Sequence, residues 1–188
     1  MALTADGKRL LALLEKPLDG AGNTLLIHEF DLASRQFTGV RYEYPLDSQP
    51  GAESPDAHAI GDFIMIDEKR GLVIERDGTQ GDLDGYKKVH LIELPQGGGR
   101  VDKTELVDLM KIADPDRISA GPQNGVGEGG ETFAFPFVTI EDIVLIDPFH
   151  IGVLNDNNYP FSVGRHVSQD LPDDTEFIII ELPVRLVF

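Results

Sequence analysis

One short pattern occurs three times along this chain: a pair of apolar strands joined by a tight turn, with a polar side chain directly after the second strand. The second strands end at Leu14-Glu15-Lys16, Ile74-Glu75-Arg76 and Leu154-Asn155-Asp156. Strand pairs repeated at intervals of tens of residues are more typical of propeller blades than of a sandwich. The repeat therefore predicts an all-β chain of about three β-propeller blades, each made of antiparallel strands.

Local signals place the strands around this pattern. Asp6-Gly7 between two apolar segments is a strong hairpin signal, and apolar residues alternate with polar ones from Val40 to Tyr44. The segment Lys88–Leu94 matches Leu25–Leu32 in form. The segment Thr104–Ile112 fits either an outer strand of the middle copy or a short amphipathic helix, and we favour a strand that runs into a short helical turn.

The chain of 188 residues is long enough for one sizeable core, so we expect a single propeller-like domain. The copies are unevenly spaced, 60 residues from Glu15 to Glu75 and 80 from Glu75 to Asn155, and residues 95–100 and 119–132 are expected to be flexible loops. The last copy has no outer strand, and three blades do not close a ring. We therefore expect the C-terminal half of a larger, six-bladed type of propeller.

The charge of the chain narrows the class of function. A formal net charge of −17, from 33 acidic and 16 basic residues, argues strongly against nucleic-acid binding and disfavours an anionic membrane surface. It fits a chain that binds hard cations through oxygen ligands. The absence of cysteine excludes disulfides, cysteine-ligated zinc and thiol catalysis. No apolar stretch reaches the roughly 18 residues that span a bilayer, and no signal peptide starts the chain, so a cytoplasmic location stays open.

Carboxylates at the ends of inner strands converge on the central channel of a propeller, where they can hold Ca²⁺ against a phosphoester. The predicted metal ligands are Glu15, Glu75, Asp77, Glu141, Asp156 and Asn157. The predicted catalytic residues are Glu75, Arg76, Glu141 and Asp156. Cations close to such a cluster can clamp a phosphate, and the predicted substrate-binding residues are Lys16, Arg165 and His166.

Each of these residues also has a purely structural interpretation. Glu75, Arg76 and Asp77 can form a salt-bridged corner between adjacent blades, with Arg76 neutralising a buried acidic neighbour. Lys16 and His166 can be solvent exposed. Four histidines are scattered without metal-ligand spacing: His28, His58, His90 and His150. His28 and His90 occupy corresponding places in the later strands of their copies, which suggests that they pack in the core.

Five stretches carry more specific motifs: 10–18 (LLALLEKPL), 42–46 (YEYPL), 72–77 (LVIERD), 135–142 (FPFVTIED) and 155–160 (NDNNYP). In this order they resemble the phytase-like family, named for an esterase-like activity of phytase, over nearly the whole chain. The resemblance implies a bacterial β-propeller, periplasmic or secreted. It also implies an esterase-like hydrolase acting on a small-molecule ester or phosphoester.

Three functional hypotheses stay open. The first is a Ca²⁺-assisted hydrolase of phosphoesters or esters. The second is a non-catalytic propeller that binds a partner, with calcium structural or absent. The third is an incomplete unit that must self-associate or pair with a partner half-propeller through exposed blade edges. None of the three involves nucleic acid or a membrane span.

Overall fold

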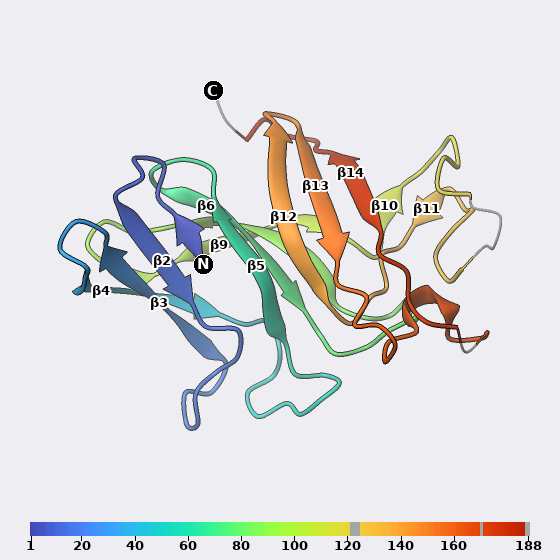
Figure 1. Cartoon of the computed structure of the whole chain (residues 1–188), viewed down its shortest axis with the longest axis horizontal. Coiled ribbons are helices and arrows are strands. Elements are labelled where there is room, and N and C mark those ends of the chain that lie inside the picture. The colour runs from blue at the N-terminus through green and yellow to red at the C-terminus, as the bar shows by residue number, and fades with distance from the viewer. Residues whose placement is uncertain (121–124, 170, 187–188) are drawn as a thin grey trace.

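The computed structural model describes residues 1–120, 125–169 and 171–186. Three sheets of mainly antiparallel strands and one short two-stranded ribbon make up the fold (Figure 1). The helical element of the described residues is one turn of 3₁₀ helix, Gly164–His166. The all-β prediction is therefore confirmed. No helix in this part of the chain is long and apolar enough to cross a membrane.

The first sheet is formed by the N-terminal strands in chain order, each antiparallel to the next: β1 (Ala2–Leu3), β2 (Arg9–Leu13), β3 (Thr24–Asp31) and β4 (Gln36–Pro45). The predicted Asp6-Gly7 turn joins β1 to β2, and the Gly7 N–H donates to the Thr4 carbonyl. Gly7 has a φ of 68°, a left-handed conformation that favours glycine. The short strand β8 (Gly99–Arg100) lies within residues 95–100 and joins the β4 edge in parallel.

The middle sheet is a second antiparallel set: β5 (Ala59–Met65), β6 (Arg70–Arg76), β7 (Lys87–Glu93) and β9 (Asp102–Asp108). β9 shows that the ambiguous segment Thr104–Ile112 is an outer strand, followed by two turn residues. β10 (Ile112–Ala113) and β11 (Thr132–Phe133) then form the separate ribbon. Within the predicted loop 119–132, residues 121–124 lie outside the described residues.

The last sheet contains three antiparallel strands: β12 (Ile140–Asp147), β13 (His150–Asn155) and β14 (Phe177–Glu181). The predicted turn between two apolar runs links β12 to β13, where Asp147 lies opposite His150. No fourth strand joins this sheet in the part of the chain that the structure describes. The expectation that the last copy lacks an outer strand agrees with this.

The middle sheet lies between the other two (Figure 1). Successive side chains of a strand point to opposite faces, so β6 supplies two cores. Val73 packs with the first sheet against residues such as Leu11, whereas Leu72 and Ile74 pack into the core shared with the last sheet. This double role explains why every residue of β6 after Arg70 is buried.

The first strands of the three sheets converge. β1 and β12 both contact β5, and the Ile60 N–H of β5 donates to the Glu15 carbonyl at 3.0 Å. Glycine is required at position 61, because a Cβ there would lie 1.8 Å from the Ile140 carbonyl oxygen. The end of β2, the end of β6 and the start of β12 are thus brought to one place.

Candidate functional site

Glu15 and Glu141 line a small pocket where the three sheets come together, and the buried Arg76 lies close to both carboxylates. Arg76 Nη2 lies 3.9 Å from Glu15 Oε1 and 3.3 Å from Glu141 Oε1. The pocket has a volume of about 150 Å³ and is lined by Met1, Leu13, Glu15, Ile60, Gly61, Asp62, Phe63 and Glu141. The structure therefore brings together three of the predicted site residues, one from each sheet.

Strand geometry explains this meeting. Arg76 is the last residue of β6, Glu141 is the second residue of β12, and Glu15 follows β2. The Arg76 side chain is 8% exposed, whereas Glu15 is 58% and Glu141 43% exposed. Arg76 Nε has no hydrogen-bond partner among the described residues. A buried guanidinium beneath two exposed carboxylates leaves carboxylate oxygens open to a ligand from solvent.

Glu75 lies on the other face of the middle sheet, because adjacent residues of a strand point in opposite directions. Its buried carboxylate has four hydrogen-bonding partners: Tyr44 Oη at 2.8 Å, the Asp47 N–H at 2.7 Å, His58 Nδ1 at 2.7 Å and Lys103 Nζ at 2.6 Å. Each carboxylate oxygen has two of these partners. Glu75 therefore links the first sheet to the middle sheet.

The charges of this cluster are set by burial and by Lys103. Burial raises the pKa of Glu75, but the hydrogen bond from His58 and the Lys103 ammonium outweigh it, so the pKa lies below its ordinary value. Burial likewise raises the pKa of Asp47, and the hydrogen bond from Lys103 brings it below the usual range. Burial lowers the pKa of His90 from 6.5 to about 4, and the charge of Lys103 acts in the same direction.

Side-chain ligand atoms of Asp47, Glu75 and His90 lie within 4.8 Å of one another, so this cluster could hold a metal ion. The Lys103 ammonium lies between the two carboxylates, 2.8 Å from Asp47 Oδ1 and 2.6 Å from Glu75 Oε2. A ligand set that contains an imidazole suits Zn²⁺ better than Ca²⁺. We interpret the cluster as an ion-pair network in which the ammonium group takes the place of a metal cation.

Replacing Lys103 by Met is expected to create a working metal site. Methionine keeps the length of the side chain but removes the ammonium, which leaves two carboxylates without their cation. Zn²⁺ at 100 times its Kd should then stabilise Lys103→Met by about 2.7 kcal/mol, measured as a rise in melting temperature. Asp47→Ala in the same background is the matched control. An equal response to Zn²⁺ in the parent chain would contradict this interpretation.

Three of the predicted metal ligands make their contacts away from the pocket: Asp77, Asp156 and Asn157. Asp77 Oδ1 accepts a hydrogen bond from the buried Lys87 ammonium just after β6. Asp156 and Asn157 each accept a hydrogen bond from the backbone N–H two residues further on, at 3.0 and 3.1 Å. These bonds close the turn after β13. Among the described residues, no hydrogen bond or ion pair joins these side chains to the charged residues of the pocket.

The predicted substrate-binding residues also lie in different places. Lys16 is 71% exposed, and its Nζ is 3.9 Å from the carboxylate of the preceding residue in the pocket. Arg165 is buried, and its Nε donates to Glu176 Oε1 at 2.6 Å. His166 is buried with Nε2 2.7 Å from Asp174 Oδ2. Lys16 is thus the one of the three that adjoins the pocket.

The partners of Glu75 are not evident from the sequence. Asp47 and His58 fall in the stretch between the first and second copies, where no periodicity marks them. Lys103 reaches Glu75 because β9 pairs with β7 in a particular register, which local sequence does not determine. The isolated histidines were the one feature of the sequence that pointed to this cluster. His90 was interpreted as a packing residue, and its side chain is buried at 2% exposure.

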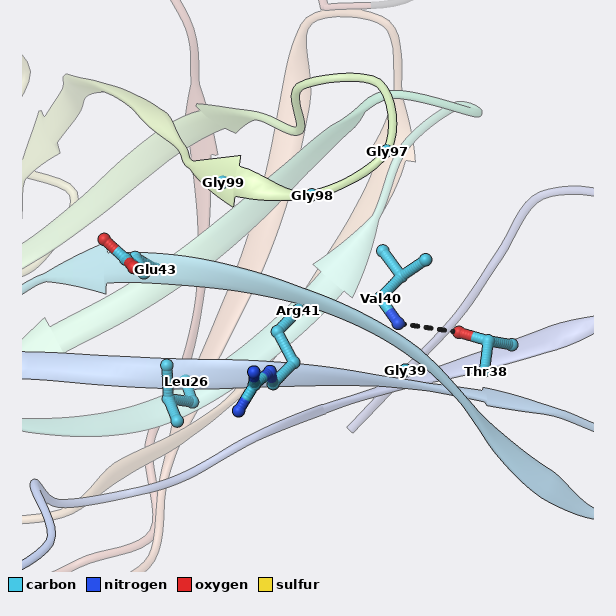
Figure 2. Close-up of a pocket in the computed structure, with 9 residues that line it drawn as sticks. All are labelled: Leu26, Thr38, Gly39, Val40, Arg41, Glu43, Gly97, Gly98 and Gly99. Atoms are coloured by element: carbon cyan, nitrogen blue, oxygen red, sulfur yellow. Dashed lines mark hydrogen bonds between the residues drawn. The ribbon is translucent and has the colours of Figure 1, made fainter.

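A larger groove of about 570 Å³ lies on the first sheet, where β4 meets the glycine loop 97–99. Figure 2 shows Arg41 and Leu26 side by side beneath this loop. The loop passes so closely that a Cβ at Gly98 would lie 2.6 Å from the Arg41 carbonyl oxygen. The lining holds one cation and one carboxylate, Arg41 and Glu43, and no histidine. The pocket at Glu15 is therefore the stronger candidate for chemistry.

Comparison with protein families gives one finding. A family model described as phytase-like, with an esterase-like activity of phytase, matches residues 1–159. The matched range includes Glu15, Arg76 and Glu141, and the match confirms the resemblance drawn from the motifs. Comparison with curated proteins gives no match, and neither does comparison with solved structures.

Proposed function

Because the chain belongs to the phytase-like family, we propose that it is a propeller-type hydrolase of phosphoesters or carboxylic esters, assisted by Ca²⁺. Its three sheets would be three blades of a larger, six-bladed type of propeller. The proposal depends on one observation: the exposed carboxylates of Glu15 and Glu141 line a pocket where the first strands converge, and the buried Arg76 lies 3.9 and 3.3 Å from them. Location in the periplasm or outside a bacterial cell, as the motifs imply, is part of the proposal.

The donors of the pocket fit a hard divalent cation. Ca²⁺ prefers carboxylate and water oxygens in flexible geometry. Glu15 and Glu141 are both exposed, so their side chains can turn toward a shared ion, and the pocket leaves room for water ligands. When bound, the ion would offset the negative charge of a substrate and lower the pKa of a coordinated water.

The protein residues would supply positioning and proton transfer. Arg76 supplies a positive charge beside both carboxylates, and a guanidinium also matches the geometry of a phosphate or carboxylate ester oxygen. Glu141 is open to solvent and can accept the proton of an attacking water as a general base. Lys16 adds positive charge at the rim of the pocket, where an anionic substrate would enter.

Hydrolysis should require both the cation and a pocket carboxylate. With phytate, p-nitrophenyl phosphate and p-nitrophenyl acetate as substrates, chelation of Ca²⁺ and the variant Glu141→Gln are each expected to lower kcat/KM by about 100-fold. Glu105→Gln is the matched control, because this exposed carboxylate of β9 lies outside the pocket. Turnover that is indifferent to both changes would refute the mechanism.

A second candidate is a non-catalytic binding module in which calcium is structural. The cluster around Glu75 favours it, because the hydrogen bonds to that carboxylate from Tyr44 and from the Asp47 N–H join the first sheet to the middle sheet. The same assay separates the two candidates. A rise in melting temperature with Ca²⁺, without turnover of any ester, would support the binding module over the hydrolase.

A further inference from the structure

The first sheet turns an apolar outer face to solvent. Leu3, Leu10, Phe30 and Phe37 lie opposite one another across its four antiparallel strands and form one row. Leu3 is 51% and Phe37 65% exposed, and the rings of Phe30 and Phe37 pack edge to face with centroids 5.2 Å apart. Nothing else in the described chain covers this row, which we call the first-sheet face.

The last sheet has a matching outer face. Val144, Gly152 and Ile179 lie opposite one another across β12, β13 and β14, and Ile146 and Phe177 extend the row along the strands. The four large side chains are between 46% and 61% exposed. A Cβ at Gly152 would lie 2.5 Å from the Phe177 ring, so glycine there lets the ring lie flat on the sheet. We call this surface the last-sheet face.

Apolar sheet faces of this kind already pack against one another inside the chain. The opposite faces of the same two sheets are buried against the middle sheet, apolar row on apolar row. Charged side chains stand on both exposed faces. Arg41 and Glu43 lie on the first-sheet face, and Asp142 and Glu181 lie on the last-sheet face. All four are exposed, and none has an ion-pair partner among the described residues.

We propose that a second copy of this chain covers both faces. The first-sheet face of one copy packs on the last-sheet face of the other, and a twofold axis repeats the contact. The first and last sheets lie on either side of the middle sheet (Figure 1), so two head-to-tail contacts can close a ring of six sheets. Association thus uses sheet faces rather than the exposed strand edges expected from the sequence.

This pairing would also complete the candidate site. The pocket lies where the first strands converge, which is the side of each copy that faces the shared axis. The two Glu15–Arg76–Glu141 clusters would then face one another across that axis. The proposal depends on the sheet faces and not on hydrolysis, so the association and the activity can fail separately.

The net charge of −17 per copy predicts how salt acts on the pair. Two like-charged chains repel one another at long range, whereas the apolar contact itself is insensitive to moderate salt. Screening should therefore strengthen association as NaCl rises from about 50 to about 300 mM. A dimer held mainly by ion pairs would weaken over the same range.

Sedimentation equilibrium of the full 188-residue chain tests the proposal. A species of twice the chain mass is expected, with a concentration dependence that fits a monomer–dimer equilibrium. Phe37→Asp on one face and Ile179→Asp on the other should each raise the dimer Kd by about 100-fold, because each buries an unpaired charge in the contact. Leu83→Asp is the control, since Leu83 is 54% exposed and lies on neither face.

Mixing Phe37→Asp with Ile179→Asp gives a sharper test. In a head-to-tail pair, the mixture retains one contact between two intact faces, so a weaker mixed dimer should form where neither variant dimerises alone. A monomer at all concentrations would overturn the proposal. So would a dimer that resists both variants, a dimer broken by one variant only, or assembly into open polymers.

Discussion

Replacing Glu75 by Ala should lower the free energy of unfolding by about 3–5 kcal/mol. The carboxylate is fully buried and is held by donors from both the first and the middle sheet. Its loss leaves the Lys103 ammonium, 8% exposed, with Asp47 as its one remaining carboxylate. It also leaves the Tyr44 hydroxyl without the acceptor it donates to. The contact between the two sheets therefore loses a buried, hydrogen-bonded connection.

Urea unfolding followed by circular dichroism measures this loss, since the chain has no tryptophan. Glu105→Ala is the matched control on the same sheet. Glu105 also binds a lysine, Lys88, at 2.6 Å, but its carboxylate is 50% exposed. An exposed pair of this kind contributes at most about 1 kcal/mol. A loss of that size in Glu75→Ala would show that the cluster does not hold the sheets together.

The strand pairs were predictable because their signals are local. The Asp6-Gly7 turn needs a residue that tolerates positive φ, and the alternation from Val40 to Tyr44 needs one buried face. Both signals lie within a few residues of the elements that they predict. The outer strand in Thr104–Ile112 was harder to predict, because apolar spacing alone does not separate a short strand from a short helix.

The polar contacts were harder to predict because they depend on strand direction and register. Glu75 and Arg76 are neighbours in sequence, yet one faces the first sheet and the other faces the last sheet. Glu75 and Asn155 hold matching register positions, opposite Ile60 and Ile140 of the preceding strands, and both are buried. Asn155 likewise holds a loop, donating to the Asp174 carbonyl at 2.8 Å. The repeat is therefore present in the backbone pairing. The residue of β6 that lies close to Glu15 and Glu141 is the next one, Arg76.

Lowering the pH from 7.5 to 5.0 should cost the fold about 2 kcal/mol through His90 alone. Burial holds the pKa of His90 in the folded chain at about 4, against an ordinary 6.5. Between these values the unfolded chain binds a proton that the folded chain does not, so stability falls as the pH falls. Glu75 and Asp47 have lowered pKa values, so their contribution is lost only below about 4.5.

Urea unfolding at several pH values isolates this effect when the parent is compared with His90→Gln. The variant should lose about 2 kcal/mol less than the parent between pH 7.5 and 5.0, because it carries no imidazole to protonate. An unchanged slope in His90→Gln would mean that His90 is charged in the fold. The Lys103 ammonium 2.6 Å from Glu75 would then share the cluster with a second cation.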